Sequence, residues 1–140
     1  MADERLFQSE TELDALFEAF EAARIPNEAW QHRDHLAIAA LYLLQRKGLD
    51  DIRAGIQKLN AANGVEVTPT GGYHETITRA WTHLVAHRLE AEKGDRLMKV
   101  NAVIAELGDK KLLLRYYSRD RIMSQEARYG WLEPDLENLP

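Results

Sequence analysis

Three histidines lie at spacings that suit metal binding or acid–base chemistry. His32 and His35 are three residues apart, so they occupy neighbouring positions on one face if this segment is helical. His74 follows Gly71 and Gly72 and would reach the same site from a facing helix. Three imidazoles leave a coordination position open for water, so we predict a divalent-metal site at His32, His35 and His74. His35 and His74 are also the candidate catalytic residues, because a metal-bound water or an imidazole base would support hydrolysis.

A structural role for the same histidines is the alternative. A buried imidazole must be hydrogen-bonded, so His74 would be a satisfied core histidine if its partners are protein groups. If it is a ligand-binding group instead, burial and the helix N-terminus lower its pKa and keep the ring neutral. The sequence thus leaves two hypotheses open. One is a histidine-lined pocket that binds a small ligand or a divalent metal, with hydrolysis as the expected reaction if the protein is an enzyme. The other is a noncatalytic ligand-binding or protein-interaction module with a structural histidine network.

A small polar pocket is predicted on the inward side of a helix expected over residues 73–91. At about 100° per residue, the apolar side chains of this helix fall in one arc, and His74 and Thr78 lie inside that arc. Aromatic side chains would form the walls, and Arg128 would be available for an anionic group of a small-molecule ligand. The residues predicted to bind the ligand are Thr78, Trp30, Trp81, Tyr117 and Arg128.

The outward side of the same helix contains two more histidines. His83 and His87 are four residues apart, a spacing that also suits a metal, but the wheel places them with Thr76 on the polar side. We therefore expect the side chains of His83 and His87 to be solvated. Glu75 falls near the opposite face from His74, where the positive end of the helix dipole stabilises a carboxylate.

Apolar stripes and helix caps predict an all-α, single-domain helical bundle over residues 1–140. The stripes account for about five main helices plus short C-terminal helical turns. Residues 36–44 are apolar nearly all round, so the second helix should be central. Segments 1–8 and 132–140 are expected to be extended or poorly ordered ends. The expected helix starts are Ser9, Asp34, Asp50, Tyr73 and Asp95, and those of the short turns are Asp109, Ser118 and Ser124.

The composition excludes several classes of site. The chain has no cysteine, which excludes disulfides, thiolate zinc sites, iron–sulfur clusters and cysteine nucleophiles. The motifs of the common nucleotide-binding and serine-hydrolase folds are also absent. At 140 residues the chain is long enough to bury a core without a structural metal. Any metal must therefore be bound by His, Asp or Glu side chains.

Charge and hydropathy limit the expected partners. The net charge of −5 disfavours nucleic acid as a partner. The longest apolar run, at 36–44, is about half as long as a membrane span, and acidic residues open the N-terminus. We therefore expect a cytoplasmic protein with no membrane partner. A small-molecule ligand is the expected partner, and the sequence leaves a homo-oligomer open.

Short motifs between residues 30 and 140 resemble those of a family of short bacterial helical proteins that has no established activity. The motifs are H-x-x-H-L at 32–36, G-Y-H-E-T-x-T-x-x-W at 72–81, S-x-E-A-R at 124–128 and P-D-L at 134–136. The resemblance implies a shared helical fold and draws attention to five positions. These are His35, His74, Glu75, Trp81 and Arg128. The resemblance implies no reaction.

Overall fold

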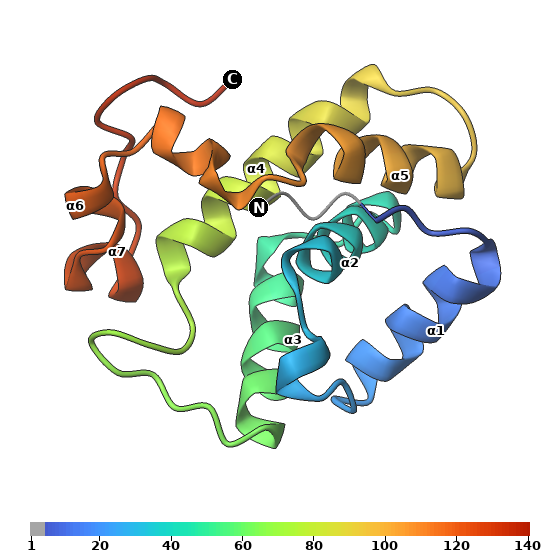
Figure 1. Ribbon diagram of the computed structural model, residues 1–140, viewed down its shortest axis with the longest axis horizontal. Helices are drawn as coiled ribbons and strands as arrows, with labels where there is room; N and C mark the ends of the chain where they lie inside the picture. The colour runs from blue at the N-terminus through green and yellow to red at the C-terminus, as the bar shows by residue number, and fades with distance from the viewer. Residues whose placement is uncertain (1–4) are drawn as a thin grey trace.

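Five helices of 12 to 17 residues form a bundle in the computed structural model, which describes residues 5–140 (Figure 1). They are α1 (Glu10–Glu21), α2 (His32–Leu44), α3 (Leu49–Ala62), α4 (Glu75–Ala91) and α5 (Arg96–Leu107). The shorter elements are η1 (Asn27–Ala29) before α2 and, after α5, η2 (Lys110–Arg115), α6 (Arg119–Ile122) and α7 (Gln125–Tyr129). Within residues 5–140 there is no strand, only an isolated bridge between Thr68 and Gly71. The predicted all-helical fold is confirmed.

α2 is the central helix because its residues are apolar nearly all round. Seven consecutive side chains, from Leu36 to Tyr42, are buried. The helix contacts α1, α3, α4 and α5, and Figure 1 shows it in the middle of them. The central position predicted for the second helix is confirmed. In the described part of the chain, no helix combines the length and the apolarity that a membrane crossing requires.

α2 begins earlier than predicted. Its first residue is His32, its N-cap is Gln31, and Asp34 lies in the first turn. There the Asp34 carboxylate accepts a hydrogen bond from the Gln31 backbone amide at 3.0 Å, which satisfies an amide at the helix end. The prediction of Asp34 as the N-cap is wrong, because an aspartate can support a helix start from inside the first turn as well as from the cap. His32 and His35 consequently lie one helical turn apart.

Residues 130–140 form no helix or strand and lie against α4 and the segment after η2. The Thr76 hydroxyl donates to the Gly130 carbonyl at 2.6 Å and accepts from the Leu132 amide at 3.1 Å. The Tyr117 hydroxyl donates to the Leu132 carbonyl at 2.8 Å. Thr76 is therefore buried, although the wheel places it toward the polar side of the helix. A helical wheel contains no information about a distant segment that covers the polar side.

The N-terminal segment, residues 5–8, likewise forms no helix or strand and is held at Phe7. The side chain of Phe7 is buried, and its backbone amide and carbonyl both bond to the Asn101 side chain of α5 at 2.9 Å. Residues 5–8 of the predicted end are thus attached to the bundle. Residues 1–4 of that prediction lie outside the described residues.

Gly55 of α3 lies against the ring of Phe20, which stacks on Trp30. A β-carbon at position 55 would lie 2.5 Å from Phe20 Cε2, and the Phe20 side chain is 1% exposed, so the ring has little room to move. We expect Gly55→Ala to lower the free energy of unfolding by about 1 to 3 kcal/mol, the usual cost of overpacking. Urea denaturation measures this loss. Gly48→Ala is the control, because no heavy atom lies within 4 Å of the added carbon. Equal losses in the two variants would contradict the packing argument.

Candidate functional site

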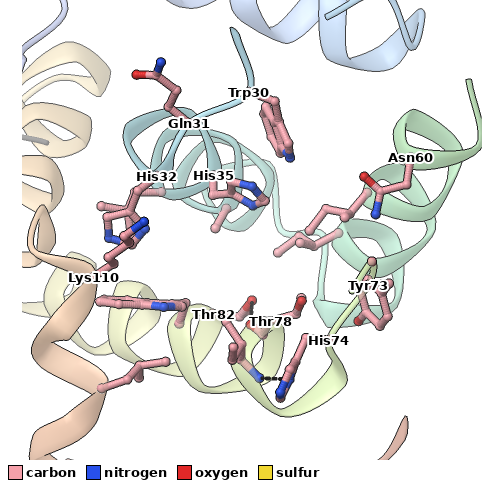
Figure 2. Close-up of a pocket in the computed structure, with 18 of the residues that line it drawn as sticks. Trp30, Gln31, His32, His35, Asn60, Tyr73, His74, Thr78, Thr82 and Lys110 are labelled. Carbon is pink, nitrogen blue, oxygen red and sulfur yellow. Dashed lines mark hydrogen bonds between the residues drawn. The ribbon is translucent and has the colours of Figure 1, made fainter. Parts of the chain in front are cut away.

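A cavity of about 1020 Å³ lies among α2, α3, α4 and η2 (Figure 2). α2 and α4 form two facing sides, with α3 and η2 between them, and the loop from α3 to α4 contributes Gly71 and Gly72. The volume is at the upper end of the range of small-molecule sites. Apolar side chains that line it include Leu36, Ile52, Ile56, Ile77 and Leu113.

The cavity gathers most of the residues that the sequence predicted for the site. Those that line it are His32, His35, His74, Thr78, Trp30, Trp81 and Arg128. Tyr117 is the exception, because its side chain is fully buried in the core and its hydroxyl bonds to the Leu132 carbonyl. Aromatic and basic residues alternate around position 117. This pattern does not show whether the tyrosine side chain faces the core or the cavity.

His35 lies in the cavity with its ring against Trp30 (Figure 2). The two ring centroids are 4.1 Å apart, and within residues 5–140 neither ring nitrogen of His35 has a hydrogen-bond partner. Burial, with a smaller contribution from the neighbouring His32, lowers the pKa of His35 from 6.5 to about 3. The ring is therefore neutral at pH 7 and offers one N–H donor and one acceptor nitrogen to a molecule in the cavity.

His74 is the N-cap of α4. Its Nδ1 accepts from the Ile77 amide at 3.1 Å, and its Nε2 donates to the Ile122 carbonyl at 2.7 Å. Because one partner is a donor and the other an acceptor, the pattern fits a neutral ring with its hydrogen on Nε2. Burial lowers the pKa of His74, and the positive charge of Arg128 acts in the same direction. His74 is thus the satisfied core histidine that the sequence left open as an alternative.

The predicted three-histidine metal site does not form. Within residues 5–140, no group of three or more His, Asp or Glu side chains is arranged to hold a metal ion. Both ring nitrogens of His74 bond to the backbone, and His32 Nε2 bonds to the Leu107 carbonyl at 3.0 Å. The ring of His32 also contacts Trp81, at a centroid distance of 4.6 Å. The three histidines do line one cavity, as their spacing predicted. The ring nitrogens of His32 and His74, however, bond to backbone groups and not to a shared metal ion.

Arg128 is buried in the cavity wall without an acidic partner. Its side chain is 8% exposed, and Nη1 donates to the carbonyls of Gly72 at 2.7 Å and Tyr73 at 3.4 Å. Nε is buried and has no acceptor, and within residues 5–140 no carboxylate forms an ion pair with this guanidinium. A buried cation is costly when nothing balances its charge, so this residue indicates where a ligand could supply the missing anion.

Trp30 is a second unpaired donor of the cavity wall. Its Nε1 is buried and has no acceptor among the described residues, although the ring stacks on Phe20 with centroids 5.3 Å apart. Buried polar groups in proteins are nearly always hydrogen-bonded, so an exception beside a cavity points to an acceptor on a bound molecule. Asn60 of α3 and Thr78 of α4 lie around the same space (Figure 2). No sequence pattern selects Asn60, because an isolated polar residue on a helix is usually solvated.

Glu75 is held by Arg53 of α3. Arg53 donates from Nε to Glu75 Oε1 at 2.8 Å and from Nη2 to Oε2 at 2.5 Å, and the Tyr73 hydroxyl donates to Oε1 at 2.7 Å. The hydrogen bonds from Arg53 are the largest cause of the lowered pKa of Glu75, so the carboxyl stays ionised. The predicted position of Glu75 in the first turn of α4 is correct. Its partner Arg53 could not be predicted, because the two residues lie on different helices and show no helical spacing in the sequence. The pair ties α3 to the start of α4.

No protein-family model, curated protein or solved structure matches the chain. The family resemblance of the short motifs therefore stays an expectation. The function has to be argued from the cavity itself, because a helical bundle by its fold alone implies no activity.

His83 and His87 are exposed on α4, as the wheel predicted. Neither residue lines the cavity. His83 Nε2 donates to the Pro140 carbonyl at 2.5 Å, so this histidine serves as a contact for the segment that covers α4. The two histidines are therefore suitable control positions on the same helix as His74.

Proposed function

We propose that the protein binds a small organic molecule in the cavity among α2, α3, α4 and η2. The observation that carries the proposal is a set of polar atoms in the cavity wall that have no partner within residues 5–140. They are the ring nitrogens of His35, Nε1 of Trp30 and Nε of Arg128. Trp30 and His35 come from the start of α2 and the residues before it, Arg128 comes from α7, and all three line a mainly apolar space. A few polar groups that converge on an apolar cavity are the usual composition of a small-molecule site.

The ionisation of His35 favours binding over hydrolysis. A general base works best when its pKa lies near the working pH, whereas the pKa of His35 is about 3. Such an imidazole is a weak base but a good neutral hydrogen-bonding group. We therefore favour noncatalytic binding, and hydrolysis stays a prediction that requires a base other than His35. The concave shape and the volume of the cavity also fit a small molecule better than they fit the surface of a partner protein.

The neutral dye N-phenylnaphthylamine, whose fluorescence rises in apolar surroundings, tests this proposal. We expect saturable binding to the wild-type protein and an affinity about tenfold or more lower in Thr78→Phe, because a phenyl ring at this lining position would project into the cavity and take up space that the dye needs. His83→Phe adds the same ring on the exposed face of α4 and should bind the dye like the wild type. Thermal unfolding of both variants checks that the fold is retained. Equal binding by the two variants, or none by the wild type, would reject the cavity as the site.

A further inference from the structure

The charged residues around the cavity all have the same sign. Among residues 5–140, the lining contains the cations Arg5, Lys110 and Arg128 and no Asp or Glu. The whole chain has a net charge of −5, so an acid-free lining differs from its average composition. A concave surface lined by charges of one sign concentrates the field and attracts the opposite charge. The cavity therefore favours a negatively charged molecule.

Arg128 has one edge of its guanidinium without a protein partner among residues 5–140. Nη1 is already used by the carbonyls of Gly72 and Tyr73, whereas the N–H groups of Nε and Nη2, which share the other edge, have no acceptor within residues 5–140. Two parallel N–H groups match the two oxygens of a carboxylate in spacing and direction. This edge is therefore better suited to a carboxylate than to an isolated carbonyl.

The start of α4 adds to the preference for an anion at this end of the cavity. The two carbonyls bound by Arg128 belong to the residues immediately before His74, the N-cap of α4. The positive end of the dipole of this helix is stabilised by negative charge. Glu75 is the acid in the first turn, but its charge is already balanced by Arg53. Glu75 is thus paired with Arg53 and is not the partner of Arg128.

The remaining lining suits a flat apolar body. Trp30 and Trp81 line the cavity together with aliphatic side chains such as Leu36 and Ile52. Trp30 already contacts Phe20 and His35, and Trp81 contacts His32, so these rings form an aromatic wall against which a further ring can pack. Resting on the proposed function, we infer that the ligand is an aromatic carboxylate, with its carboxylate on the Nε and Nη2 edge of Arg128 and its ring in the apolar part of the cavity.

Naphthoate and naphthamide are matched probes for this inference, because they share a ring system and differ in charge. Each is titrated at pH 7 against bound N-phenylnaphthylamine. We expect naphthoate to displace the dye from the wild-type protein at a concentration about ten- to hundredfold lower than naphthamide, the usual effect of a charge-assisted pair of hydrogen bonds. In Arg128→Met the two probes should displace the dye at concentrations within about twofold of each other, because the two N–H groups that distinguish a carboxylate from an amide are removed.

A second pair of variants leaves Arg128 and the loop that it holds intact. Lys110→Glu places an acid in the lining, whereas Lys111→Glu makes the same charge change at an exposed neighbour that does not line the cavity. We expect Lys110→Glu to weaken naphthoate about two- to fivefold without affecting naphthamide, as expected for a charge at the edge of a site. Lys111→Glu should leave both probes unchanged.

The outcomes separate this inference from the proposed function. Equal displacement by naphthoate and naphthamide in the wild type would overturn the carboxylate, while dye binding that Thr78→Phe abolishes would still support the cavity. Equal effects of Lys110→Glu and Lys111→Glu on naphthoate would also count against it. A wild-type protein that fails to bind the dye would overturn the proposed function instead.

Discussion

Replacing Tyr117 with alanine is expected to lower the free energy of unfolding by about 3 to 5 kcal/mol, the usual cost of deleting a large buried aromatic side chain. The Tyr117 side chain is 0% exposed, and its ring meets that of Trp131 edge to face at a centroid distance of 6.4 Å. Its hydroxyl donates to the Leu132 carbonyl at 2.8 Å. Burial raises the pKa of Tyr117 to about 12, so the hydroxyl remains a donor at neutral pH. Urea denaturation followed by circular dichroism measures the loss.

Tyr117→Phe separates the contribution of the ring from that of the hydroxyl. This variant keeps the ring and removes only the bond to Leu132, so we expect a loss of about 1 kcal/mol. A Tyr117→Ala variant that loses no more than Tyr117→Phe would show that the ring contributes nothing to the core. Because Leu132 belongs to the segment that covers Thr76, both variants should also increase hydrogen exchange in residues 130–140.

Acidification from pH 6.5 to pH 5 is expected to lower the stability of the wild-type protein by about 1.5 kcal/mol through His35 alone. The pKa of His35 is 6.5 in an unfolded chain and about 3 in the folded one, so between these values the unfolded state binds a proton that the folded state does not. The contribution of the neutral His35 to the free energy of unfolding is therefore fully present above pH 6.5. It is lost progressively as the pH falls toward 3. Glu75 has a lowered pKa and therefore stays ionised between pH 6.5 and pH 5.

His35→Asn isolates this contribution. The variant removes the titrating ring, so its stability should decrease about 1.5 kcal/mol less than that of the wild type over the same pH range. His83→Asn is the control, because His83 is exposed and lies outside the cavity. Chemical denaturation at both pH values measures the three proteins. The same pH dependence in His35→Asn and the wild type would contradict the burial of a neutral His35.

Local patterns in the sequence were sufficient for the helices and for the inward side of α4. The stripe at 36–44 predicted the central helix, and the wheel separated the inward His74 from the exposed His83. Both results depend on side chains of one helix and on its period of 3.6 residues. This is the kind of information that a single sequence contains.

Partners from distant parts of the chain could not be predicted in this way. Thr76 is buried because residues from 130 onward cover it, and Glu75 is paired because α3 brings Arg53 beside it. The same limit applies to His74, whose ring is occupied by the Ile122 carbonyl and is not available to a metal. Every residue has a backbone carbonyl, so the sequence does not indicate which carbonyl a given side chain bonds to. The three-dimensional structure is needed for that.

The cavity wall combines residues that the ribosome makes at different times. Arg128 bonds to the Gly72 carbonyl across 56 residues of sequence, and α7 follows α2, α3 and α4 in the chain. Proteins emerge with their N-terminal part first, so these three helices can associate before Arg128 has been translated. A nascent chain at that stage already contains His35, Trp30 and Trp81 but lacks the cation that we assign to the carboxylate. Retention of an anionic ligand would then begin only after residue 128 has left the exit tunnel.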